Sequence, residues 1–370
     1  MKQRQIGCRA APFVEAVAAP CTRIGAALLL VGLAIAGPCA AQATASPAPL
    51  HLRIVGGLAA VSQYTRHEEP FWTRDLARLS GGRVSAEIVP FDRAGIRGQE
   101  MLRLVQVGAV PFGTSLLNLS AVLDAELGAP DLAGLNPDAA TLRRSVTAFR
   151  PYLDKMLRER YGTELLALYA YPAQATFCAK PLASLADLAG RRIRVSSATQ
   201  SDWVTALGAM PVQTPFGEIV ANIRSGNIDC AITGTMSGNT IGLHEVTSHI
   251  HTMPVNWGVG AFVANGATWA ALPKDVQALL RRELPRLEQE IWDEAERETS
   301  EGVACNIGSS ECIVGRKGRM VQVRATPADA VKRREILASS VLPGYLKRCG
   351  AQCSLIWKQT VGAASGIALP

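Results

Sequence analysis

The sequence predicts an α/β fold of two successive lobes, each a mostly parallel sheet flanked by helices, with a long helix that bridges them. Residues 51–118 alternate between strand-like and helix-like segments in the order βαβαβ, and the same alternation returns between residues 175 and 233. Strands that alternate with helices favour parallel sheets wrapped by helices. A third pattern, an amphipathic helix over residues 272–302, is long enough to brace both lobes.

In the first lobe, short apolar or alternating runs predict strands, and apolar residues at helical spacing predict helices. The predicted strands are 51–56, 84–88 and 109–116, and the predicted helices are 69–79 and 99–107. Glycines follow both helices, as expected at helix ends.

A predicted helix at 139–161 and a strand at 165–169 lead into the second lobe. The strands predicted there are 192–195, 210–213 and 228–232, and the helices between them are 200–207 and 215–226. After the long helix, residues 303–370 predict a strand at 320–323, a helix at 327–337 and cysteine-rich loops.

The N-terminus has the layout of a secretory signal peptide. A basic start leads into the uncharged run Ile24–Gly37 and then into Ala41-Gln42-Ala43, which matches an Ala-x-Ala cleavage site. We expect residues 1–43 to be removed and the remainder to be exported. Lipidation at Cys39 is the alternative, but Gly37 and Pro38 before it are a poor context.

The charge of the chain does not favour binding to nucleic acid. The net charge of +7 falls to about +4 once the leader is removed, because the leader holds four basic residues and one acidic residue. The remaining basic residues are scattered and are not interleaved with aromatic residues, so a nucleic-acid partner is not expected.

Six cysteines follow the leader, and an even number in an exported protein is typical of disulfides. Four of them lie near the C-terminus, where Cys305 with Cys312 and Cys349 with Cys353 is the simplest of three pairings. We expect these bonds to hold a tail with little core of its own. Zinc is the alternative, but the spacings do not match a typical zinc-ligand pair and no histidine is well placed.

Arg194 is the candidate ligand anchor, because it lies near the end of a predicted interior strand. A strand covered on both faces removes water from the guanidinium, so an anion should answer the charge, ideally through two parallel hydrogen bonds. The carboxyl ends of such strands open on the crevice where open α/β sheets bind ligands. The alternative is an exposed arginine on an edge strand.

Ser196 and Ser197 follow the Arg194 strand and can supply hydroxyl or backbone donors. Two further residues have both a site interpretation and a packing interpretation. Phe216, in the first turn of a predicted helix, forms either an apolar wall against a ligand or part of the core. Trp257 belongs either to a strand that crosses between the lobes or to the pocket wall.

The chain has no catalytic signature, so neither an enzyme nor a cofactor is predicted. It lacks a Gly-x-Ser-x-Gly elbow, a phosphate-binding loop and a complete Gly-x-Gly-x-x-Gly fingerprint. His244 and His249 resemble a zinc-protease pair, but the extra residue between them turns the imidazoles roughly 140° apart on a helix. No metal site is therefore predicted.

Several motifs, in order along residues 50–300, together resemble the solute-binding proteins of TRAP transporters, the dicarboxylate-binding (DctP-like) type. The motifs are Ser80-Gly81-Gly82-Arg83, the Gly95 loop with the helix closed by Gly108, Asp187-Leu188-Ala189-Gly190, Ile193-Arg194-Val195, Thr214-Pro215-Phe216-Gly217-Glu218, Gly226-Asn227-Ile228-Asp229 and Leu272-Pro273 after Trp269.

The resemblance implies a periplasmic binding-protein fold that closes on a small organic acid and delivers it to membrane permease subunits. It implies lobe I at 44–171 and about 259–298, lobe II at 172–258 and about 299–345, and a cysteine-containing tail at 346–370. A different function on the same lobes is an exported sensing module that presents its bound acid to a membrane receptor.

The resemblance also assigns roles at the site. It gives carboxylate binding to Arg194, ring packing to Phe216 and a polar contact to Ser197. Gln174 stands where many relatives have a second arginine, and Thr233 stands where they often carry an amide or an acid. Near Gly57 and Leu116 the first lobe offers no polar side chain, so the resemblance implies a pocket less polar than one for a sugar acid.

Overall fold

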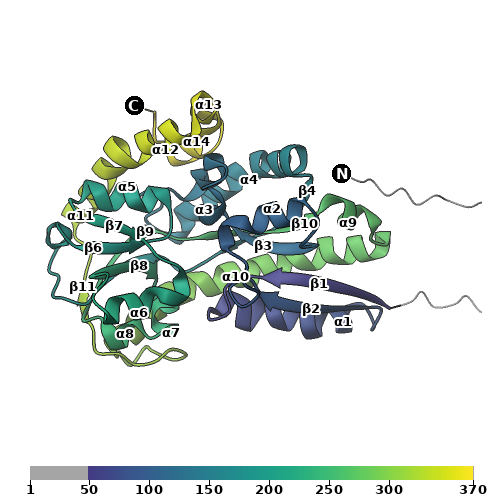
Figure 1. The fold of residues 1–370 in the computed structure, drawn as a ribbon, viewed down its shortest axis with the longest axis horizontal. Helices are drawn as coiled ribbons and strands as arrows, with labels where there is room; N and C mark the ends of the chain where they lie inside the picture. The colour runs from purple at the N-terminus through teal and green to yellow at the C-terminus, as the bar shows by residue number, and fades with distance from the viewer. Residues whose placement is uncertain (1–48, 370) are drawn as a thin grey trace, which may run out of the picture. The chain divides into compact units, whose positions relative to one another are not determined.

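The computed structural model describes residues 49–369, and the predicted signal peptide at residues 1–43 lies outside this range. The described residues form an α/β protein with two separate sheets flanked by helices, as Figure 1 shows. Between residues 49 and 369, none of the helices combines the length and apolar character needed to cross a membrane.

The first sheet has five strands in the order β2-β1-β3-β10-β4. β1 (Leu50–Gly56) pairs in parallel with β2 (Val84–Pro90) and with β3 (Phe112–Leu116). β10 (Val259–Asn265) runs antiparallel to β3 and to β4 (Thr163–Ala170). The strands predicted in the first half of the chain therefore meet in one sheet.

The second sheet has six strands in the order β11-β9-β5-β8-β6-β7. Its strands are β5 (Gln174–Cys178), β6 (Arg192–Val195), β7 (Met210–Gln213), β8 (Cys230–Gly234), β9 (His249–Asn256) and β11 (Val321–Val323). β6 is parallel to both of its neighbours, β7 and β8, whereas β5 is antiparallel to β8 and β9. β6 is thus an interior strand.

Both sheets are mixed, whereas the sequence predicted mostly parallel ones. The chain passes from one sheet to the other three times, from β4 to β5, from β9 to β10, and, through the long helix that follows, from β10 to β11. All antiparallel pairs involve β5 or β10, which are the first strands that the chain forms after crossing from β4 and from β9. The local βαβ pattern correctly predicted the parallel strands, but it carried no information about the crossing strands.

Helices cover both sheets. The main ones are α2 (Met101–Gln106), α4 (Ala139–Tyr161), α5 (Ala198–Ala206), α6 (Ile219–Arg224), α7 (Thr235–Thr240), α9 (Gly266–Ala271), α10 (Lys274–Ile307) and α11 (Pro327–Ile336). Shorter turns are α1 (Leu76–Leu79), α3 (Leu117–Ser120), α8 (Leu243–Val246), the 3₁₀ turns Gly98–Glu100, Ala125–Asp131, Leu185–Leu188 and Phe216–Glu218, and the π turns Gln63–Glu68, Phe71–Asp75 and Leu337–Val341.

The long helix α10 lies along both sheets, as predicted. It contacts β4 of the first sheet and α7 beside the second (Figure 1). The predicted apolar face is buried, with Leu280, Leu284 and Ile291 fully covered. The helix continues through Pro285 and ends at Gly308, whose φ of 77° places it in the left-handed region that closes many helices.

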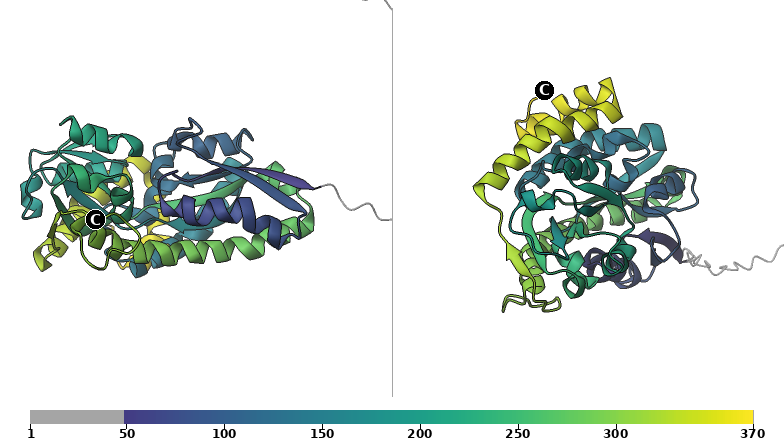
Figure 2. Two further views of the ribbon diagram at one scale, coloured as in Figure 1. Left: turned by 90° about the horizontal axis from the view of Figure 1, so that it is seen from below. Right: turned by 60° about the vertical axis from the view of Figure 1, so that its left-hand side comes forward.

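The C-terminal tail is helical and has a core, contrary to the expectation of cysteine-rich loops. It forms α12 (Leu342–Cys349), α13 (Ala351–Gln359) and α14 (Val361–Ser365), and α14 contacts α4 (Figure 2). Trp357 and Val361 are fully buried. They belong to two different helices, α13 and α14, so this core depends on how the two helices pack and not on the periodicity of a single helix.

Three disulfides join all six cysteines of the described residues. Cys305–Cys312 and Cys349–Cys353 are the predicted pairs. The third bond, Cys178–Cys230, links residues that lie directly opposite each other on β5 and β8. No pairing was predicted for Cys178 and Cys230. They lie close together because of the antiparallel register of β5 and β8, which local sequence patterns do not reveal.

Candidate functional site

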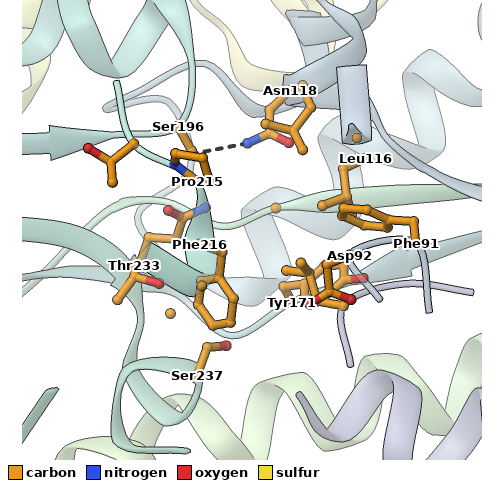
Figure 3. Close-up of a pocket in the computed structure, with 18 of the residues that line it drawn as sticks. Phe91, Asp92, Leu116, Asn118, Tyr171, Ser196, Pro215, Phe216, Thr233 and Ser237 are labelled. Carbon is orange, nitrogen blue, oxygen red and sulfur yellow. Dashed lines mark hydrogen bonds between the residues drawn. The ribbon is translucent and has the colours of Figure 1, made fainter. Parts of the chain in front are cut away.

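A cavity of about 360 Å³ lies between residues of the first sheet and residues of the second. Its walls come from the loops after the strands, from the turns at the start of the following helices, and from the crossing segments near Tyr171 and Trp257. Figure 3 shows part of this lining, with Phe91 and Leu116 on one side and Thr233 and Ser237 on the other.

Arg194 lines this cavity from the interior strand β6, with 5% of its surface exposed. Its Nε donates to the carbonyl of Thr214 at 3.0 Å, and its Nη1 donates to the carbonyl of Ile232 at 2.8 Å. Among residues 49–369, no carboxylate lies within 4.0 Å of the guanidinium. Burial lowers the pKa of Arg194 to about 10, which leaves it charged at neutral pH.

Arg192, on the same strand, differs from Arg194 in that it has a carboxylate partner within the protein. Arg192 forms a two-pronged ion pair with Asp229, with Nε to Oδ2 at 3.0 Å and Nη2 to Oδ1 at 2.9 Å. This arginine is balanced by its own carboxylate and does not line the cavity. The positive charge of Arg194 is therefore available to an anion in the cavity.

Two hydroxyl groups line the cavity together with Arg194, on the side of the second sheet. Thr233, at the end of β8, and Ser237, in the first turn of α7, are both buried and line the cavity. Neither hydroxyl has a hydrogen bond to another described residue, so both can bond to a ligand. Ser237 was not predicted as a site residue. The one sequence signal for it is its position shortly after the end of β8.

Ser197 lies outside this cavity, one residue beyond the lining position. Its hydroxyl accepts the backbone N–H of Gln200 at 3.2 Å and so caps α5. Ser196 lines the cavity instead, and its hydroxyl accepts from Nδ2 of Asn118 at 3.4 Å (Figure 3). This bond joins the first-sheet side of the cavity to the second-sheet side.

Gln174 lines the cavity, but its amide is engaged by the protein. Its Nε2 donates to the carbonyl of Trp257, and its Oε1 accepts from Gln200 at 2.9 Å. Gln200 also donates to Asn256 at 2.8 Å, and Asn256 donates to the buried carboxyl of Asp131 at 3.1 Å. This network connects the two crossing segments. The residues that it joins are far apart in the sequence, so no local sequence pattern indicated it.

Phe216 and Trp257 both line the cavity, and both also pack against the hydrophobic core. Phe216 is partly exposed in the 3₁₀ turn after Pro215 (Figure 3). Trp257 is 3% exposed, lies between β9 and β10, and donates from its indole nitrogen to the carbonyl of Asn136 at 3.0 Å. Its ring is thereby held in one orientation beside the ligand space.

The remaining wall comes from the first sheet and its loops, and it combines five apolar side chains with the polar side chains of Asp92, Arg97, Gln99 and Asn118. None of these residues was predicted as part of the site, although the low polarity near Leu116 was. The apolar residues are Leu58, Phe91, Ile96, Leu116 and Leu119.

Behind this wall lies a buried carboxyl, that of Glu68. It accepts from the backbone N–H of Gly57 at 2.7 Å and from the hydroxyl of Thr114. Burial is the main cause that raises the pKa of Glu68 to about 7. In the unfolded chain a glutamate titrates near 4.3.

We expect Glu68→Gln to gain stability relative to the wild type as pH rises from 5 to 8. Between the two pKa values the folded protein keeps a proton that the unfolded chain loses, so this carboxyl contributes stability that declines toward pH 7. The relative gain should be about 2 kcal/mol, since one pKa unit is worth about 1.4 kcal/mol. Urea unfolding midpoints at several pH values measure it.

Glu69→Gln is the matched control, because Glu69 is exposed on the adjacent position. Its stability relative to the wild type should stay constant with pH. Parallel curves for all three proteins would contradict the assignment of a raised pKa to Glu68.

One set of metal-type ligands lies together away from the cavity. Atoms of Glu126, Cys349 and Cys353 lie within 4.8 Å of one another. The two sulfurs are joined in a disulfide, and Glu126 is paired with Arg160 at 3.1 Å. The carboxylate and both sulfurs are thus already engaged, and this group is not a metal centre.

The chain is similar to curated solute-binding proteins and to solved structures of such proteins. The ectoine-binding periplasmic protein TeaA of Halomonas elongata is 25% identical over 126 residues, which are 34% of this chain and 37% of that protein. The match thus spans little more than a third of the length of this curated relative.

The structure of DctP7, a pyroglutamic acid-binding extracytoplasmic solute receptor of Bordetella pertussis, has a TM-score of 0.73 at 21% identity, covering 84% of this chain and 98% of that one. A TRAP periplasmic solute-binding protein of Desulfovibrio salexigens with bound orotic acid has a TM-score of 0.75 at 19% identity, covering 85% and 98%. These likenesses establish the fold.

A model of the family described as bacterial extracellular solute-binding protein, family 7, matches residues 60–307. The match covers every strand of the two sheets except β1 and β11, and it includes all of α10. The resemblance drawn from the sequence motifs is confirmed, and the chain belongs to the bacterial extracellular solute-binding proteins of family 7.

Proposed function

We propose that this protein is the solute receptor of a TRAP transporter, which captures a small carboxylate and delivers it to membrane permease subunits. The observation that carries the proposal is the buried guanidinium of Arg194, which faces a cavity with no carboxylate of the described residues beside it. A buried charge is stable only when it is paired, and a ligand carboxylate completes the pair.

The geometry around Arg194 favours a carboxylate over other anions. Two of its five N–H donors are held by carbonyls, which fixes the plane of the fork. The remaining donors can meet both oxygens of a planar carboxylate, while Thr233 and Ser237 offer hydroxyls nearby. The bound pyroglutamate and orotate of the two solved relatives are also carboxylates.

The ligand is held by closure of two lobes, which we assign to 44–171 with about 259–298 and to 172–258 with about 299–345. The crossing segments at Tyr171–Gln174 and Asn256–Gly258 are the hinge candidates, because both sheets are connected there. A ligand that contacts both lobes shifts the population toward the closed form. Binding and release require no bond to be made or broken, so the protein is not an enzyme.

This function requires export to the periplasm, which the signal peptide at residues 1–43 provides. The family to which the chain belongs is extracellular by its description. The tail at 346–370 contacts α4 and does not line the cavity, so it braces the lobes without touching the ligand.

Carboxylates should raise the melting temperature of the purified protein, and their neutral amides should not. A ligand at a hundred times its Kd stabilises the folded state by about 2.7 kcal/mol. A thermal-shift panel of acids, each paired with its carboxamide, measures the effect. A panel in which no acid stabilises the protein, or in which the amides do so equally, would contradict the proposal.

A further inference from the structure

We infer that the ligand of this receptor is a monocarboxylate with a single apolar, ring-sized body, rather than a dicarboxylate or a polyhydroxy acid. The inference rests on the proposed function and specifies its substrate class. It follows from the way that charge and polarity are divided across the cavity.

The buried groups that can bind an anion gather at one pole of the cavity, on the second sheet. Arg194 is the buried cation there, and the hydroxyls of Thr233 and Ser237 lie on the same side. The amide of Gln174 is also at this pole, but both of its polar atoms are bonded to the protein. One ligand carboxylate therefore satisfies the available donors of this pole.

The opposite pole is largely apolar, although Gln99 and Asn118 also line it and the hydroxyl of Tyr171 has no hydrogen-bond partner among the described residues. Five side chains from the first sheet and its loops face the cavity, and the rings of Phe216 and Trp257 close two further sides. A hydroxyl or a second carboxylate placed against these walls loses its hydrogen bonds to water without replacement, which is unfavourable. An apolar body gains from the same burial. The five are Leu58, Phe91, Ile96, Leu116 and Leu119.

The cavity offers no second charge partner for a dicarboxylate. Arg97 is the other cationic side chain in the lining, but it is paired with Glu100 and 78% exposed. Asp92 also lines this side and adds a negative charge, with Oδ1 accepting from Ala59 at 3.0 Å. A second carboxylate at this end would be repelled by Asp92 rather than held.

The size of the cavity agrees with a ring-sized ligand. Its volume of about 360 Å³ corresponds to about a dozen water molecules at ~30 Å³ each. A short aliphatic diacid leaves much of the apolar wall in contact with water, whereas an arylalkyl acid such as phenylacetate covers it.

Phenylacetate should bind at least tenfold more tightly than succinate or pyroglutamate in calorimetric titrations of the wild-type protein. Leu119→Gln places an amide in the apolar wall and should weaken phenylacetate at least fivefold while changing succinate less than twofold. Leu123→Gln is the matched control, since Leu123 is 57% exposed and does not line the cavity. The melting temperature of each unliganded variant reports whether it folds.

The possible outcomes distinguish a failure of this inference about the ligand class from a failure of the proposed receptor function. Tight phenylacetate binding that is lost in Leu119→Gln and kept in Leu123→Gln supports the inference. Tighter binding of succinate or pyroglutamate overturns it, while receptor function for carboxylates stands. Equal loss for both acids in a folded Leu119→Gln variant also overturns it. Absence of binding by every acid overturns the inference and the proposed function together.

Discussion

Replacement of Arg194 by alanine should weaken carboxylate binding by more than a hundredfold. Truncation of one partner in a buried, hydrogen-bonded charge pair costs about 2–5 kcal/mol, and each 1.4 kcal/mol is a factor of ten in Kd. The loss falls at the upper end of this range because the guanidinium is 5% exposed and water screens it little. Calorimetric titration of the wild type and the variant with one acid measures the change.

The same variant should fold as well as the wild type. An unliganded buried cation is a cost to the folded state, and its removal offsets the two hydrogen bonds lost to Thr214 and Ile232. The melting temperature without ligand should therefore stay within about 3 °C of the wild type, or ~1 kcal/mol for a protein of this size. The ligand-induced shift should disappear.

Arg192→Ala is the matched control for Arg194→Ala. Both residues are arginines on β6, but Arg192 is paired with Asp229 and lies outside the cavity. Its removal should leave the affinity within about twofold of the wild type, which is ~0.4 kcal/mol. Unchanged affinity in Arg194→Ala, or an equal loss in both variants, would remove Arg194 from its assigned role.

The parts of the fold that the sequence predicted are those with local causes. The strands around Arg194 and the helix at 139–161 follow from apolar periodicity and from glycines at helix ends, which are read within a few residues. Arg194 itself stood out because a charge in an apolar strand conflicts with its surroundings. Such conflicts between local chemistry and burial are expected where a ligand binds.

The parts that the sequence did not predict depend on distant residues. The apolar wall joins Phe91 and Leu116 with Trp257, and no pattern in any one segment relates them. The position of Ser197 shows the limit of local inference, because successive residues after a strand point in different directions. Ser197 became a helix cap, and Ser196 took the place in the cavity lining.

The disulfide Cys178–Cys230 is also a product of long-range register, and it lies away from the cavity. Gln174 and Gly234 pair at the cavity end of β5 and β8, whereas the cysteines pair at the other end, four residues along. At ~3.4 Å per residue, the bond is roughly 14 Å from the cavity end. It should therefore affect stability without affecting affinity.

The double variant Cys178→Ala/Cys230→Ala should lose about 4 kcal/mol of unfolding free energy. The bond spans a sequence separation of 52, and loop-closure entropy grows with the logarithm of this length. The double variant Cys305→Ala/Cys312→Ala is the control, since a separation of 7 predicts a loss of only about 2 kcal/mol. Guanidinium unfolding measures both losses, and titration with a bound acid should give wild-type affinity in each. Equal losses in the two variants would show that native-state packing around the sulfurs, rather than the constraint on the unfolded chain, determines what these bonds contribute.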